Sequence, residues 1–506
     1  MYRYLKEVLE RYTRIVVWGT GNFYLLYGDL LDERVVYIID NKKEKCGMSL
    51  DGKVVFSPEK LKEEDPDKTL IIICNHYFEE ISTQIKQYGD FDIIDIVTMD
   101  LLQKKEKENK NNTRTEDKVS SNIIVCGGIH AMWQTNGSRR FIEGQLEHLH
   151  QAGFHTIETI PLLYYLEGKR ESSFLAVSVN RIYQGILSID EFVRKYSIVR
   201  GIIFHSPYYS QNTMKDLLDT MQVESQVLYY IHDYASLCSY RFLHRNQKLC
   251  IGIDGEVCCK SCDMKEEQKE ILNFHQSVFD KYQVLLIAPS EDTKKRVQLF
   301  YKKTPIAVMP HLRFEQEDFR KRINDRIRIA YIGTAIWHKG WELFSRIVDQ
   351  FHQKYEFYCL GDCPDELKIS NVTYVPVGLY HADYISTMVE VLLRYNIDIA
   401  YIGSVWPETY SYTYYEAYEA GCFVITSALS GNVSGQVIAN QNGRSFSNES
   451  DMMAWLEKGT VRRDIMSLKK RIKNVWSNDE FLKYFQYEGW NDKRTERNGT
   501  GIQEHV

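Results

Sequence analysis

The chain has 506 residues, of which 44% are hydrophobic, and a formal net charge of -6. This length and composition predict a globular protein of about three domains, and the negative charge argues against nucleic-acid binding. No apolar run approaches the roughly eighteen residues that span a bilayer, and the charged residues 1–14 differ from a signal peptide. We therefore expect a cytoplasmic protein with at most peripheral membrane contact.

Short apolar runs alternate with helical patterns along the chain, which is typical of parallel sheets flanked by helices. We predict an α/β fold with three Rossmann-like domains. The first covers 1–102 and is followed by a charged linker, 103–121, which lacks apolar periodicity. The second domain covers 122–310, the third covers 311–490, and 491–506 is expected to be a frayed tail.

The first block opens with VVWGTGNFY and continues with VVYIIDN. Gly19 and Gly21 would form the tight strand-to-helix turn of nucleotide-binding βαβ units, and Asp40 ends the second strand about twenty residues later. Tyr24 stands where the third glycine of that fingerprint would be. The block resembles small Rossmann-like domains appended to bacterial sugar-processing enzymes. A ligand-binding, docking or vestigial role is as consistent with the block as a dehydrogenase role. No Tyr-x3-Lys pair that could relay a proton follows the glycine turn within the block, which argues against catalysis there.

Two segments of the second block contain candidate site residues. In TNGSRRFIEGQLEHLHQAGF, Gly137 stands at the start of a predicted helix, where a simple N-terminal turn explains the glycine nearly as well as a binding role does. In QVLYYIHD, a buried strand ends at His232, beside Asp233. A histidine in that position is either a structural hydrogen-bond partner or a functional group at the end of the strand.

Five of the eleven cysteines lie in one short polar segment: Cys238, Cys250, Cys258, Cys259 and Cys262. The spacing of the last pair would let two thiolates reach one tetrahedral zinc ion. Because the segment has few apolar residues, a metal would supply order that it otherwise lacks. We predict a structural zinc at Cys238, Cys250, Cys259 and Cys262. His244 is a competing ligand, and free or transiently oxidised thiols are the alternative.

The third block contains PETYSYTYYEAYEAGC between the apolar runs NIDIAYIGS and CFVITS. This pattern predicts a strand, a loop, a helix over 412–420 and a second strand, with Gly421 at the helix C-cap. Glu408 would lie in the loop at the carboxyl end of the first strand, and Glu416 one helical turn inside. Ligands of open α/β sheets bind in such a crevice. The alternative is that both are ordinary surface carboxylates.

The first turn of that helix would also face the crevice. Its free N–H groups, together with the helix dipole, form an anion site suited to phosphate. The residues concerned are Ser411, Tyr412 and Thr413.

The spacing Glu-x7-Glu, followed by Ala, a small residue, Gly and a strand, resembles the donor-site signature of family 4-like retaining glycosyltransferases. The resemblance covers approximately 122–490 and implies that the last two domains form a GT-B cleft. It implies that Glu408 contacts the donor sugar, that Glu416 holds the ribose hydroxyls, and that His232 lies near the sugar. Such proteins often carry a Cys-rich insert after the His-Asp strand.

The segment GTAIWHKGWELF resembles the loop with which this family grips the donor diphosphate through an Arg and a Lys. Gly333 opens the loop, and Lys339 matches the Lys. Thr334 stands where the Arg usually is, so the grip would rely on His338 or another residue. His311 replaces the Asn of the family's Pro-Asn-Gly, and no chemistry follows from it.

Together these features predict a retaining, hexosyltransferase-like glycosyltransferase of polysaccharide or glycan assembly. It would move a sugar from a nucleotide-sugar donor to a glycan, lipid-linked or other acceptor. Glu408 and His232 would be catalytic, and no cofactor would be required. The donor would be bound by Glu416, Lys339, Gly333, Ser411, Tyr412, Thr413 and Gly137.

Two other functions remain open. One is a non-catalytic partner subunit that binds a nucleotide sugar, which Thr334 makes credible. The other is an NAD(P)-dependent sugar-nucleotide oxidoreductase that acts through the first domain.

Overall fold

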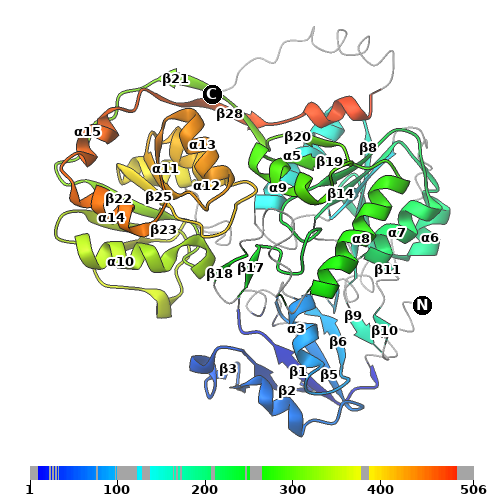
Figure 1. Cartoon of the computed structure of the whole chain (residues 1–506). Helices are drawn as coiled ribbons and strands as arrows, with labels where there is room; N and C mark the ends of the chain where they lie inside the picture. The colour runs from blue at the N-terminus through cyan, green and yellow to red at the C-terminus, as the bar shows by residue number, and fades with distance from the viewer. Residues whose placement is uncertain are drawn as a thin grey trace, which may run out of the picture. The chain divides into compact units, whose positions relative to one another are not determined.

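The protein is represented by a computed structural model (Figure 1). The structure describes residues 10–21, 24, 28, 31, 33–75, 78–96, 98–99, 122–127, 137–162, 164–166, 169–170, 174–206, 211–245, 248–250, 262, 265–377 and 387–486. The predicted linker 103–121 lies outside these ranges. So does the predicted tail 491–506.

The chain divides into two compact units. The first consists of Met1–Trp133, Phe154–Ile202 and Tyr208–Glu224. The second consists of Gln134–Gly153, Ile203–Pro207 and Ser225–Val506. The predicted boundaries of the three domains stay predictions.

A mainly parallel sheet organises the start of the first unit, in the order β10-β9-β6-β5-β1-β2-β4-β3. Strands β1, β2, β4, β5 and β6 pair in parallel, and β3, β9 and β10 pair antiparallel. Runs of Ile and Val bury most residues of the central strands. The elements are β1 (Arg14–Trp18), β2 (Val35–Ile39), η2 (Lys43–Lys45), β3 (Ser49–Leu50), β4 (Lys53–Phe56), η3 (Pro58–Glu63), β5 (Thr69–Ile73), α3 (Phe78–Ile85), β6 (Asp92–Asp95), β9 (Tyr164–Leu166) and β10 (Lys169–Arg170).

The rest of the first unit contains a second group of strands. Strand β7 pairs in parallel with β8, which continues antiparallel to β11 and then β12. Ser188 starts the next helix with a capping box, in which its hydroxyl accepts from the Glu191 N–H. The elements are β7 (Asn122–Cys126), β8 (His155–Pro161), β11 (Phe174–Val179), β12 (Ile182–Ser188), α6 (Ile189–Lys195), β13 (Ile198–Val199), α7 (Gln211–Thr220) and β15 (Gln222–Val223).

The second unit begins with helix α5 and a group of parallel strands. Strand β16 pairs with β19, and β19 with β20, while the Ser206 N–H after β14 bonds to the Tyr230 carbonyl at 3.0 Å. The elements are α5 (Gly137–Gln151), the end of β14 (Gly201–His205), β16 (Val227–Tyr230), β17 (His244–Arg245), β18 (Lys248–Leu249), α8 (Lys265–Lys281), β19 (Leu285–Ala288), α9 (Glu291–Phe300) and β20 (Ile306–Val308).

A six-stranded, all-parallel sheet completes this unit, in the order β24-β23-β22-β25-β26-β27. This is the doubly wound order, in which successive strands are added on one side of β22 and then, from β25 on, on its other side. The strands are β22 (Arg328–Ile332), β23 (Glu356–Leu360), β24 (Val372–Val375), β25 (Ile399–Ile402), β26 (Phe423–Ser427) and β27 (Gly443–Phe446). Beside them β21 (Leu312–Asp318) and β28 (Lys470–Ser477) form an antiparallel pair.

Helices cover both faces of this sheet (Figure 1). Alternate residues of β22 enter different cores: Tyr331 packs with Trp341 and Trp455, and Ala330 packs with Tyr414 and Val433. Figure 1 accordingly shows α10 on one side of the sheet and α11, α12 and α13 on the other. The helical elements are η5 (Trp337–Lys339), α10 (Trp341–Phe351), η6 (Asp365–Leu367), α11 (Met388–Arg394), α12 (Tyr412–Glu419), α13 (Asn432–Asn440), α14 (Glu449–Glu457), α15 (Val461–Met466) and η7 (Glu480–Tyr484). The predicted α/β fold with parallel sheets is confirmed.

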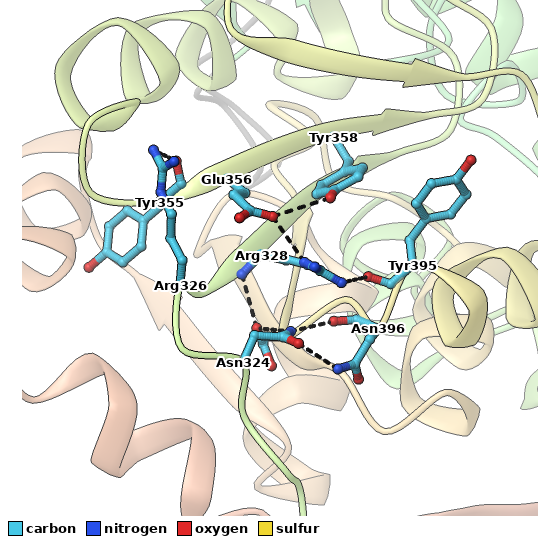
Figure 2. A network of polar contacts seen from close by, with 9 residues as sticks. Asn324, Arg326, Arg328, Tyr355, Glu356, Tyr358, Tyr395 and Asn396 are labelled. Carbon is cyan, nitrogen blue, oxygen red and sulfur yellow. Dashed lines mark hydrogen bonds and ion pairs between the residues drawn. The ribbon is translucent and has the colours of Figure 1, made fainter.

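A polar network fixes the amino ends of these strands (Figure 2). Arg328 donates from Nε to Glu356 Oε2 at 3.0 Å and from Nη1 to the Tyr395 carbonyl at 2.9 Å. Its backbone N–H donates to Asp398 Oδ2 at 2.9 Å, and the Asn324 amide donates to the same oxygen at 2.7 Å. Asp398 is fully buried. The network thus lies at the edge of the sheet opposite the carboxyl ends.

Replacing Asp398 by Ala would leave two donors without their acceptor, each costing about 1–3 kcal/mol when buried. We expect Asp398→Ala to lower the free energy of unfolding by at least about 2 kcal/mol in denaturant titration. Asp365→Ala is the matched control, since Asp365 forms an exposed pair with Lys368 and should change stability by under about 1 kcal/mol. Equal losses in both variants would contradict the role given to the network.

Candidate functional site

Two loops meet at the carboxyl edge of the six-stranded sheet. One follows β22 and the other follows β25, which are neighbours in the sheet. The Val405 N–H bonds to the His338 carbonyl at 3.0 Å and joins the loops. Gly340 has φ +84°, and a Cβ there would lie 2.1 Å from the Gly403 carbonyl oxygen. Only glycine permits this approach.

Glu408 lies in the second loop with its carboxylate buried. It is 2% exposed, and Lys339 from the first loop forms an ion pair with its Oε1. The Ser404 hydroxyl donates to the same oxygen at 2.5 Å. The Lys339 ammonium also lies 5.7 Å from the centre of the Trp406 ring, so an aromatic face supports the cation. The structure therefore brings together two predicted site residues that are 69 positions apart.

The backbone around Glu408 is held from several sides. The Asn432 N–H bonds to the Glu408 carbonyl at 3.0 Å, and the Tyr234 hydroxyl donates to the Pro407 carbonyl at 3.1 Å. A Cβ at Gly431 would lie 2.8 Å from Pro407 Cα. The position of Glu408 thus depends on contacts that only the folded chain supplies.

Helix α12 begins where the second loop ends, and the predicted helix with Gly421 after it is confirmed. Gly421 has φ +69°, as expected of a glycine that ends a helix. At the other end, the Ser411 side chain makes no cap hydrogen bond, and its hydroxyl bonds instead to Thr413 Oγ1 at 2.9 Å. The N–H groups of the first turn therefore keep their donor capacity for an anion.

Glu416 lies one turn into α12 and pairs with Arg140 of α5. The distance from Arg140 Nη1 to Glu416 Oε1 is 2.8 Å, and the guanidinium carbon lies 4.6 Å from the centre of the Tyr412 ring. Gly137 starts α5 against the same ring, because a Cβ there would lie 3.2 Å from Tyr412 Cδ2. Among the predicted donor residues, Gly333 follows β22 with φ +112°, a conformation that favours glycine.

His232 belongs to a cluster of buried imidazoles. Its Nε2 lies 2.9 Å from His205 Nδ1, and His205 Nε2 lies 3.1 Å from Gln145 Oε1. Phe141 stacks on His311 with ring centres 4.1 Å apart, and His311 lies 5.5 Å from His232. Burial lowers the pKa of His232 to about 3 and lowers the pKa values of His205 and His311 well below their usual range. All three rings are therefore neutral at neutral pH.

When the Gln145 amide oxygen is the acceptor, the hydrogen bonds of this cluster follow one chain of donors and acceptors. The amide oxygen of Gln145 can only accept, so His205 carries its proton on Nε2 and offers a lone pair on Nδ1. His232 then donates from Nε2 and leaves its Nδ1 as an acceptor. Within the described part of the chain, His232 Nδ1 has no hydrogen-bond partner. The Thr409 hydroxyl donates to the His232 carbonyl at 2.6 Å, which places the histidine next to the Glu408 loop.

The remaining predicted site residues lie elsewhere. In the first unit, Gly19 has φ +118° at the end of β1, Gly21 follows it, and Asp40 accepts hydrogen bonds from Thr20 Oγ1 and the Lys42 N–H. Their role in binding a nucleotide stays a prediction.

The structural zinc at the cysteine cluster stays a prediction. Cys259 lies outside the described residues, and in the ranges that the structure describes no group of three or more His, Cys, Asp or Glu side chains could hold a metal. Cys238 is buried, and Cys250 and Cys262 are half-buried.

None of the described helices combines the length and the apolar composition that a membrane span requires.

Sequence reasoning missed Arg140, Ser404, His205 and Gln145. Arg140 is one of two adjacent arginines on a polar helix, and nothing in its surroundings distinguishes it from a solvated charge. His205 ends an apolar run, as His232 does, and that parallel could have drawn attention to it.

Comparisons with known proteins give limited matches. The family model described as C2185-like, N-terminal, matches residues 11–94. A search of curated proteins gives no match.

Among solved structures, the chain is similar to sucrose-phosphate synthase from Thermosynechococcus elongatus, with a TM-score of 0.44 and 13% identity, covering 75% of this chain and 98% of that one. It is similar to WaaG, a glycosyltransferase involved in lipopolysaccharide biosynthesis, with a TM-score of 0.40 and 10% identity, covering 75% and 100%. It is also similar to Anabaena HepE in complex with UDP and glucose, with a TM-score of 0.36 and 11% identity, covering 97% and 100%.

The ion pair between Lys339 and Glu408 can be tested by a double-mutant cycle. Lys339→Met would leave a buried carboxylate with the Ser404 hydroxyl as its remaining partner. We expect a loss of about 2 kcal/mol in the free energy of unfolding, less than a fully buried pair would show because Lys339 reaches solvent. Glu408→Gln should cost less, and the double variant should be more stable than the sum of the two losses predicts.

The control is Lys368→Met, which removes an exposed pair with Asp365 and should cost under about 1 kcal/mol. Additive losses at Lys339 and Glu408 would show that the two side chains do not interact.

Proposed function

We propose that the protein is a glycosyltransferase that transfers a sugar from a nucleotide-sugar donor to an acceptor hydroxyl with retention of configuration. The observation that carries this proposal is the meeting of Lys339 and Glu408 at the carboxyl edge of the sheet, beside the first turn of α12. A cation, a buried carboxylate and free N–H donors there suit a diphosphate joined to a sugar. Glu416, one turn along the helix, suits a pair of ribose hydroxyls.

The proposed reaction follows from these positions. The donor's bond from the anomeric carbon to the phosphate oxygen breaks, and the acceptor oxygen bonds to that carbon from the same face. The acceptor proton passes to the departing nucleoside diphosphate. Lys339 and the N–H groups at the start of α12 stabilise the charge that grows on the diphosphate. This sequence needs no metal or other cofactor.

Donor binding would change the partner of Glu408. In the structure Lys339 neutralises the carboxylate, and a diphosphate would compete for the same ammonium group. Glu408 would then place its negative charge beside the sugar as positive charge develops at the anomeric carbon. His232 Nδ1 is suited to accept a hydrogen bond from a sugar hydroxyl. We propose Glu408 and His232 as the groups that touch the reacting sugar.

A second function has one specific observation in its favour. Thr334 stands at the position where the related loop carries an arginine, so a diphosphate would meet fewer charges there. A non-catalytic subunit that binds a nucleotide sugar would have this property. The measurement that separates the two functions is donor consumption, which only the enzyme shows.

Substitutions of the two glutamates should change different kinetic constants. Glu408→Gln keeps the shape of the side chain but removes its charge, so kcat should fall at least about a hundredfold while nucleotide affinity persists. Glu416→Ala should instead raise the donor KM about tenfold or more, since it removes charged hydrogen bonds to the ribose. Initial rates at varied donor concentration, with calorimetric nucleotide affinity, measure both effects.

The matched control for Glu416 is Glu449→Ala, because Glu449 also pairs with an arginine, Arg346, at 2.7 Å. It should leave both constants unchanged. If Glu408→Gln and Glu416→Ala kept wild-type kcat and KM, the proposed donor site would be wrong.

A further inference from the structure

We propose that Arg140 binds the donor diphosphate and supplies the positive charge that Thr334 cannot provide. This inference rests on the proposed function, because it assigns a further residue to the same donor site.

The position of Arg140 supports the assignment. Its guanidinium lies over the ring of Tyr412, the first residue of α12, at 4.6 Å. The guanidinium therefore lies against the side chain of the residue with which the first turn of α12 begins. Arg140 is also half-exposed, so a ligand can reach it without displacing a packed side chain.

The charges around the site explain why a second cation is needed. A nucleoside diphosphate ester carries two negative charges on its phosphates, and Lys339 would neutralise one of them only after leaving its partner Glu408. The amino end of a helix adds the equivalent of about half a charge. The three imidazoles of the nearby cluster add none, because burial keeps them neutral. Arg140 contacts α12 from outside the two loops, through its ion pair with Glu416.

The chemistry of the guanidinium permits two partners at once. Arginine has five N–H donors in a fixed plane, and the bond to Glu416 uses Nη1. Arg140 can therefore bind a phosphate oxygen through its other nitrogens while it keeps or releases Glu416. In the structure the pair orients Glu416, and on donor binding the same arginine would connect the ribose end of the nucleotide to its diphosphate.

The experiment compares ligands that differ only in phosphate. The full-length protein is titrated calorimetrically with UDP, GDP, ADP and TDP, and the diphosphate that binds best is then compared with its monophosphate and its nucleoside. Arg140→Gln should weaken diphosphate binding about tenfold or more but change nucleoside affinity less than threefold. Arg140→Lys should restore part of the loss, because it keeps the charge.

Arg346→Gln is the matched control. Arg346 holds Glu449 through two hydrogen bonds of 2.7 and 2.8 Å on other helices, so its loss should alter no affinity. An equal loss of diphosphate and nucleoside affinity in Arg140→Gln would mean that Arg140 acts only by orienting Glu416, and would overturn the inference while leaving the proposed function intact. Unchanged affinities would also overturn it. If wild-type protein bound none of the four diphosphates, the proposed function would fail as well.

Discussion

The neutralisation of the buried Glu408 carboxylate is the interaction on which the site depends. A charge that is 2% exposed is stable only when a counter-charge and hydrogen bonds replace the water that it has lost. Lys339 and Ser404 supply both. Because Lys339 comes from a different loop, satisfying one carboxylate also fixes how two loops meet. A ligand that competes for Lys339 must therefore supply Glu408 with another positive charge. A sugar on which positive charge develops during the reaction can do so.

The topology of the sheet makes this pairing possible. The doubly wound order places β22 next to β25, so the loops after these strands are adjacent although their sequences are far apart. Gly340 and Gly431 then allow backbone contacts that a side chain would block. At the opposite edge, the Arg328 network holds the amino ends of the same strands. The polar network thus fixes the amino ends of the strands, whereas the loops at their carboxyl ends hold the charged side chains of the site.

Much of the fold could be predicted from the sequence, because it depends on local patterns. Apolar runs located the strands of the last sheet, and Gly421 located the end of α12. The loop positions of Glu408 and Lys339 followed from those strands. The pair between Arg140 and Glu416 could not be predicted, since 276 positions separate the two residues and a surface charge leaves no periodic signal. The contact between His205 and Gln145 could not be predicted either, because the two buried residues are 60 positions apart and meet only when the strand and the helix pack together.

We propose that this site transfers a sugar with retention of configuration. The most direct test is proton NMR of wild-type protein incubated with α-linked nucleotide sugars and candidate acceptors, following the anomeric signal of the first product formed. We expect that one donor is consumed, that nucleoside diphosphate is released, and that the product appears first as the α-anomer. Initial appearance of the β-anomer would contradict retention, and no consumption of any donor that binds would contradict an enzymatic role.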